Sequence, residues 1–184
     1  MKLRYVLPIA VVLGLGVASL AIASTRDHGH GKKNGNQFTA FLISENETPV
    51  ALHTNGTGKL TLTVNSNSTL SYTLTYSGLS SAANVAHVHF GKPSDSGGVI
   101  FYLCGGPKPA CPAGGGTVSG TIAAADIMGP TAQGLAVGDF PGALKEIRAG
   151  FTYANVHSTT YPGGEIRGQL GRGHDEGDDD EDDD

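Results

Sequence analysis

The sequence predicts an all-β domain: an antiparallel β-sandwich or barrel with Greek-key-like connections and one short helix. Two observations support this class. Several short stretches place apolar side chains at every second position, which is the period of a strand with one buried face. The chain also has 28 glycines and no tryptophan, and it is rich in threonine, serine and valine, a composition typical of short strands joined by turns.

Eight segments fit strands. The alternation is clearest in QFTAFLI (37–43), GKLTLTV (58–64) and LSYTLTY (70–76). The polar run NSNST between the second and third suits a hairpin loop. Further strands are expected at 85–90, 98–103, 117–122, 151–157 and 164–170.

One helix is expected within DFPGALKEIRAG (139–150). Asp139 is placed to cap its first turn and Pro141 to occupy it, while Leu144 and Ile147 share one face. The helix is short, so we expect it to cover one end of the sheet.

The first 23 residues have the pattern of a secretory signal peptide. Lys2 and Arg4 precede an apolar stretch that ends in Ala21-Ile22-Ala23, a small-x-small cleavage pattern. The alternative is an uncleaved membrane anchor, but the apolar run has the length of a signal peptide. The sequence therefore predicts an exported protein, periplasmic or extracellular, with no membrane span after cleavage.

Cleavage would leave 184 − 23 = 161 residues. We expect a polar linker at 24–36, the folded domain at 37–172 and a disordered acidic tail at 173–184. Residues 175–184 hold nine of the 17 acidic residues, so the folded part is near neutral. The tail either aids solubility or binds divalent cations weakly. No basic stripe with aromatic residues indicates a nucleic-acid partner.

The two cysteines, Cys104 and Cys111, lie in LCGGPKPACP. In an exported protein such a pair predicts a disulfide, here closing a short glycine- and proline-rich loop. A metal-binding pair is the alternative, although the spacing is not the CxxC of a zinc site.

The segment VAHVHFG (85–91) places His87 and His89 on one face of a strand, about 6–7 Å apart by the rise per residue. Tyr153 and His157 share a face of the later strand FTYANVHS. If the two strands are neighbours, a third imidazole and a phenol join the pair. The alternative is that these histidines hydrogen-bond loop carbonyl groups and have only a structural role.

Three imidazoles suit copper or zinc, and copper is favoured because it stands highest in the affinity order. His53, in TPVALHTNG, is a candidate fourth ligand. Calcium or magnesium sites would be rich in carboxylates instead.

In YPGGEIRGQL (161–170), Glu165 and Arg167 share one strand face after a proline-glycine turn. A structural ion pair between them is one interpretation. The other has Glu165 accepting a proton from a ligand histidine and so fixing its tautomer.

Four stretches, in this order, resemble the CHRD domain, the module named for its occurrence in chordin and common in exported bacterial proteins: FTAFLISENETPV, GTGKLTLTVNSNSTLSYTLTYSGL, AHVHFGKPSDSGGVIFYL and YANVHSTTYPGGEIRGQL. The resemblance spans 37–170 and implies an extracellular or periplasmic β-rich domain. In chordin the module belongs to a secreted antagonist of growth factors.

The histidine motifs of this family fall on His87, His89 and His157. The HVH element is also similar to the copper-ligand strand of copper-zinc superoxide dismutase, another β-sandwich or barrel protein. This likeness of motif suggests a distant similarity of architecture. The chain has Thr48-Pro49 where the family has a double proline after the first strand.

The function that these patterns favour is binding of a transition metal, with Tyr153, Glu165 and Arg167 close to the histidines. Storage, delivery or electron transfer needs fewer assumptions than catalysis, and catalysis would be redox chemistry at the metal. No GxSxG motif or evident carboxylate pair indicates hydrolysis. The alternative is a structural module without metal that binds another extracellular or cell-surface protein.

Overall fold

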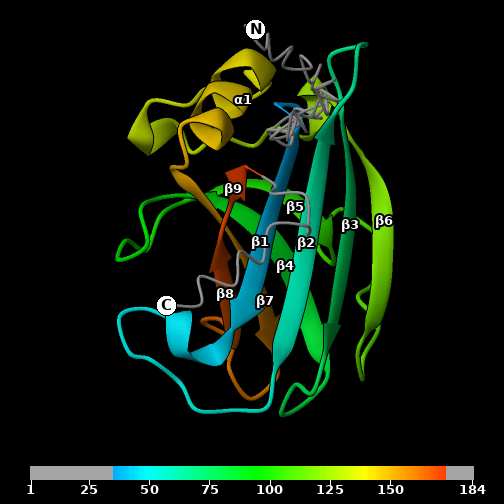
Figure 1. Cartoon of the computed structure of the whole chain (residues 1–184), viewed down its shortest axis with the longest axis vertical. Helices are drawn as coiled ribbons and strands as arrows, with labels where there is room; N and C mark the ends of the chain where they lie inside the picture. Colours follow the sequence, from blue (N-terminus) through cyan, green and yellow to red (C-terminus); the bar gives the residue numbers. More distant parts are fainter. Residues whose placement is uncertain (1–34, 173–184) are drawn as a thin grey trace, which may run out of the picture. The chain divides into compact units, whose positions relative to one another are not determined.

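The computed structural model describes residues 35–172 (Figure 1). The predicted signal peptide, nearly all of the predicted linker and the predicted acidic tail lie outside the described residues. Among the described residues, no helix has the length and apolar character needed to cross a membrane.

The described chain is all-β, as predicted, and every strand pairing is antiparallel. The strands are β1 (Gln37–Ile43), β2 (Thr57–Val64), β3 (Leu70–Ser77), β4 (Ala83–Phe90), β5 (Val99–Cys104), β6 (Gly116–Ile122), β7 (Thr152–Ser158), β8 (Ile166–Gln169) and β9 (Gly171–Arg172). All eight predicted strands are present, with bounds shifted by at most two residues, and only the short β9 was not expected.

The strands form one sheet in the order β5-β4-β7-β8-β1-β2-β3-β6, with β9 beside β1. The chain leaves β3, crosses to β4 in the other half of the sheet and later returns to pair β6 with β3, a long connection of Greek-key type. The two end strands β5 and β6 come into contact, so the sheet nearly closes into a barrel (Figure 1). The suggested likeness to copper-zinc superoxide dismutase stays a prediction.

The barrel interior holds the apolar core. In β3 every second residue is buried, and Leu74 faces Leu60 of β2 in the antiparallel register. Both side chains are fully buried, as are Phe38, Phe101 and Val156 from other strands. The period-two pattern of the sequence therefore gives the inward faces of β2 and β3 correctly.

The helix α1 (Phe140–Arg148) begins as predicted. The Asp139 carboxylate accepts a hydrogen bond from the Gly142 N–H at 2.9 Å, and a proline occupies the first turn. Phe140, Ala143 and Ile147 are buried. The helix lies over one end of the barrel, at the top of Figure 1. Short 3-10 turns are found at Ser44–Asn46, Ala124–Asp126 and Thr131–Gln133.

Cys104 and Cys111 form the predicted disulfide, which rules out the alternative of a metal-binding cysteine pair. The bond closes the loop after β5. Gly105 and Gly106 in this loop have positive φ angles of 71° and 56°, which glycine adopts without steric cost.

Two tyrosines of β3 form hydrogen bonds across the seam between the two ends of the sheet. The Tyr72 hydroxyl donates to the carbonyl oxygen of Leu103 in β5 at 2.7 Å, and the Tyr76 hydroxyl donates to that of Pro112 at 2.6 Å. These bonds join β3 to the β5 region, which lies at the far end of the strand order.

We expect Tyr72→Phe to lower the free energy of unfolding by about 1–3 kcal/mol, because the buried carbonyl oxygen of Leu103 loses its donor. Urea unfolding measures this. Tyr161→Phe is the matched control, since Tyr161 takes no part in the two cross-barrel bonds. If Tyr72→Phe and the control are equally stable, the hydrogen bond from the Tyr72 hydroxyl to Leu103 does not stabilise the barrel, and the prediction is wrong.

Candidate metal centre

The site is built on the outer face of β4 and β7. These strands pair antiparallel, so that His89 lies opposite Tyr153 and Val85 opposite His157. All seven residues of β7 are buried. The inner face of β7 packs in the apolar core. Its outer face carries a layer of buried polar side chains, which is covered by the loops that contain Gly97 and Pro162.

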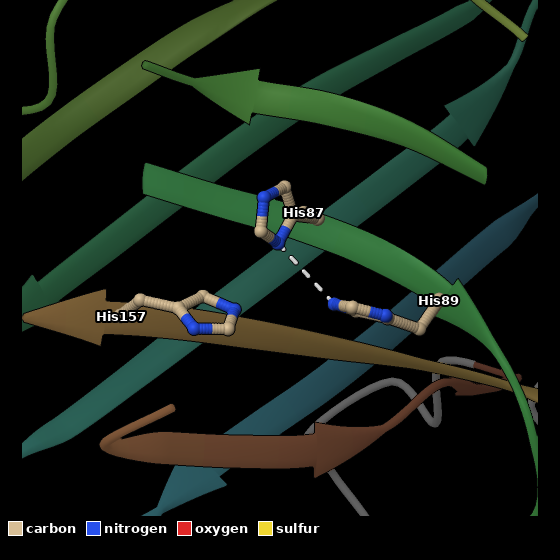
Figure 2. Close-up of side chains that lie close together, drawn as sticks. All are labelled: His87, His89 and His157. Carbon is tan, nitrogen blue, oxygen red and sulfur yellow. Dashed lines mark hydrogen bonds between the residues drawn. The ribbon is translucent and has the colours of Figure 1, made fainter. Parts of the chain in front are cut away.

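Three buried histidines converge in this layer. The side chains of His87, His89 and His157 come from two strands, and each residue is less than one-tenth exposed. One ring nitrogen from each lies within 4.8 Å of the other two. Figure 2 shows these nitrogens directed into the space between the rings. The predicted grouping of His87, His89 and His157 is thus present.

Loop carbonyl groups set the tautomers of two rings. His89 Nδ1 lies 3.0 Å from the carbonyl oxygen of Gly97, and His157 Nδ1 lies 2.9 Å from that of Pro162. Because a carbonyl oxygen only accepts, each Nδ1 carries the proton and each Nε2 keeps its lone pair. His157 Nε2 is buried and has no hydrogen-bond partner.

The third ring supplies the remaining nitrogen. His87 Nδ1 lies 3.2 Å from His89 Nε2, within hydrogen-bonding distance (Figure 2). Because His89 carries its proton on Nδ1, its Nε2 can only accept, so His87 Nδ1 is the donor in this bond. An ion between the rings requires His87 to carry its proton on Nε2 instead. The ligand atoms would then be His87 Nδ1, His89 Nε2 and His157 Nε2.

The environment keeps these imidazoles neutral. Burial, reinforced by His157 and His89, lowers the pKa of His87 from 6.5 to about 3. Burial is also the main cause that lowers the pKa of His89 to about 4, against the raising effect of the Gly97 carbonyl. The pKa of His157 is lowered too, by burial. Neutral imidazole is the form that binds metal ions.

An aromatic stack fixes His89. The Tyr153 ring lies parallel to the His89 ring, with centroids 4.8 Å apart and planes inclined by 2°. Arg167 Cζ lies 3.5 Å from the centroid of the Tyr153 ring. The Gly97 N–H donates to the Tyr153 hydroxyl at 3.0 Å, so the same glycine orients both rings.

A row of side chains crosses four neighbouring strands at this level. Tyr102 of β5 lies opposite His87, which lies opposite Asn155 of β7, and Asn155 lies opposite Arg167 of β8. The Tyr102 ring meets His87 edge to face at 4.6 Å between centroids. Tyr102, Asn155 and Glu47, which accepts a hydrogen bond from Asn155, were not predicted as site residues.

A family model described as the CHRD domain matches residues 38–170. The chain belongs to the CHRD domain family. No curated protein and no solved structure matches the chain. The site described above lies entirely within the matched segment of the CHRD domain.

The structure does not bring His53 to the histidine cluster of the CHRD domain. Its side chain is 99% exposed, and its Nδ1 lies 3.6 Å from a carboxylate oxygen of Glu45. His53 follows an irregular loop that faces solvent, so no strand register directs it toward β4 and β7.

Glu165 and Arg167 do not form the expected ion pair. Glu165 is fully buried just before β8, where Oε1 accepts from the backbone N–H and the hydroxyl of Ser80 at 2.7 and 2.8 Å. The Pro162 carbonyl, not Glu165, is the partner of His157 Nδ1. Arg167 donates to the Thr48 hydroxyl at 2.6 Å and to a main-chain carbonyl oxygen at 2.9 Å.

Stability of the metal-free CHRD domain should fall as the pH falls from about 6.5 to about 4. In this range the unfolded chain binds protons on histidines that stay neutral in the folded state. The expected slope is up to about 1.4 kcal/mol per pH unit for each histidine, and it vanishes above about pH 6.5. Urea unfolding at several pH values measures it.

Because the pKa of Glu47 is raised to about 7, its titration opposes this slope. The informative quantity is therefore the difference between the wild type and His87→Gln/His89→Gln, which should have a smaller loss of stability at low pH. His53→Gln, a change at an exposed histidine, should follow the wild type. A double variant with the wild-type slope would contradict the prediction.

Gly97→Ala should disrupt the site. An added Cβ would lie 1.7 Å from the carbonyl oxygen of Phe90, so the loop would have to move away from His89 and Tyr153. We expect affinity for added Cu²⁺ or Zn²⁺ to fall by about 10–100-fold, measured by competition with a chelating dye. Gly114→Ala, with no atom within 4 Å of the added Cβ, is the control and should leave affinity unchanged.

Proposed function

We propose that this CHRD domain binds one transition metal ion through His87 Nδ1, His89 Nε2 and His157 Nε2. The observation that carries the proposal is the buried Nε2 of His157, which has no hydrogen-bond partner and is directed toward the other two nitrogens (Figure 2). A buried acceptor without a partner costs about 1–3 kcal/mol, and a metal ion would remove that cost.

A purely structural role accounts for only part of this geometry. The bonds from His89 and His157 to loop carbonyl oxygens explain their Nδ1 atoms. They do not explain why one ring nitrogen from each of His87, His89 and His157 lies within 4.8 Å of the other two. In metal-binding histidines, the ring nitrogen that does not bind the ion usually donates a hydrogen bond, for example to a carbonyl oxygen, and this bond orients the ring.

Copper is the ion we favour, with zinc as the alternative. Three neutral nitrogen donors suit both ions, and copper stands above zinc in the affinity order. Among the described residues, the group that could hold an ion contains no carboxylate, so calcium and magnesium fit poorly. Three protein ligands leave a coordination position open, which suits delivery, electron transfer or redox chemistry.

We further propose that the domain works in the periplasm or outside the cell. The N-terminal sequence has the pattern of a signal peptide, and the Cys104–Cys111 disulfide agrees with an oxidising compartment.

Elemental analysis of the full chain, purified without chelator and after reconstitution with copper or zinc, tests the proposal. We expect about one ion per wild-type chain, as for other histidine sites. The variant His87→Gln/His89→Gln/His157→Gln should lose that ion while its circular dichroism spectrum stays the same. The matched control His53→Gln should keep it.

Every variant keeps the histidines at 28, 30 and 174 and the acidic tail. Any metal bound by these groups contributes equally to all variants, so the difference in metal content between the wild type and the triple variant reports the three histidines alone. Equal metal content in the wild type and the triple variant would contradict the proposal. That result would favour the other class of function, a module that binds an extracellular or cell-surface protein without metal.

A further inference from the structure

Two buried polar side chains, Asn155 opposite His87 and Glu47 in contact with Asn155, take no part in the histidine cluster. Glu47 is 6% exposed and Asn155 is 4% exposed. The Asn155 side-chain amide donates to Glu47 Oε2 at 3.2 Å, a contact between residues far apart in sequence. Glu47 lies in the loop after β1, directly after the turn Ser44–Asn46.

Each member of this pair keeps an oxygen that is not satisfied. Glu47 Oε1 and Asn155 Oδ1 are both buried and have no hydrogen-bond partner in the protein. Burying such acceptors costs about 1–3 kcal/mol each, so a molecule with donor groups would be stabilised here. The only polar contact between the two side chains leaves these oxygens available to it.

The pair lies next to the proposed ligands. Asn155 lies directly opposite His87 in the β4–β7 register and two residues from His157 on the same strand face. Side chains opposite each other in an antiparallel pair have Cβ atoms about 4.5–5.5 Å apart. A small molecule on an ion held by His87 and His157 is therefore within reach of Asn155.

The backbone leaves room for this arrangement and for access by solvent. At Gly164, with φ of 130°, an added Cβ would lie 2.6 Å from Asn155 Oδ1 and 2.8 Å from Glu47 Oε2. Glu47 also lines two cavities, of about 370 and about 210 Å³. Solvent in these cavities therefore comes close to this residue.

We propose that Glu47 and Asn155 form a subsite that holds a small protic ligand of the metal, water or hydroxide, and exchanges a proton with it. This inference rests on the proposed metal function and adds the chemical class of the ligand in the open position. His87, His89 and His157 would hold the ion, which would make the ligand in its open position acidic. The Glu47 carboxyl would pass its proton to the deprotonated form of that ligand and become a carboxylate, and it would take the proton back in the reverse direction.

The charge environment suits such an exchange. Burial raises the pKa of Glu47 to about 7, while Asn155 and Arg167 act to lower it. Two charged or titratable side chains interact with Glu47. Arg167 of β8 lowers the pKa of Glu47, and Glu47 in turn raises the pKa of Tyr153 of β7. A carboxyl group with a pKa near neutrality can both give and accept a proton there.

The test is electron paramagnetic resonance of the full chain loaded with one equivalent of Cu²⁺, recorded from pH 5 to pH 9. We expect a change in the wild-type spectrum with a midpoint near neutrality. Glu47→Gln should abolish this change, with copper affinity reduced by no more than about 10–100-fold, because Glu47 is not a ligand. Glu47→Asp keeps a carboxyl group and should keep the change, with a shifted midpoint.

Glu45→Gln is the matched control, since Glu45 lies in the same loop with an exposed side chain. A wild type that binds copper but shows no pH-dependent change, or a change that persists in Glu47→Gln, would overturn this inference and leave the proposed metal function standing. A wild type that binds no copper at the histidines would overturn both.

Discussion

The pairing of β4 with β7 is the contact on which the rest of this structure depends. A strand of an antiparallel sheet commonly buries one face and leaves the other in water. In this domain all seven residues of β7 are buried, because its inner face joins the apolar core and loops cover its outer face. The outer face can therefore carry polar side chains shielded from water, which is what lowers the pKa of His87 and His89.

Much of the fold and the centre of the site followed from the sequence, because both obey the period of a strand. The alternation in 85–90 and 151–157 placed His87, His89 and His157 on common faces, and the register of the sheet brought those faces together. Residues outside the strands follow no such period. His53 was therefore proposed as a fourth ligand from its residue type alone, and the structure leaves it in solvent.

The groups that orient the ligands could not be predicted for the same reason. Gly97 and Pro162 act through main-chain carbonyl oxygens, which every residue has, so no residue type marks them. Glu47 reaches Asn155 across a long separation in sequence, because β8 pairs with both β1 and β7 and so brings the loop after β1 close to β7. Glu165 was expected to pair with Arg167 or to orient a histidine, but its Oε1 accepts two hydrogen bonds from Ser80 instead.

The histidines come from two strands that are distant in sequence, and this has a consequence for how the protein is made. Of the three proposed ligands, only His87 and His89 are close together in an unfolded chain, and His157 joins them when β4 and β7 pair. Bringing His157 to the pair closes a long loop, which has an entropic cost. The free energy of folding, and not that of metal binding, offsets this cost. High affinity thus arises only with folding. If the proposed site holds an ion and the domain is exported, the ion would be acquired where the chain folds and not where it is synthesised, so the metals available in that compartment would decide which ion is bound.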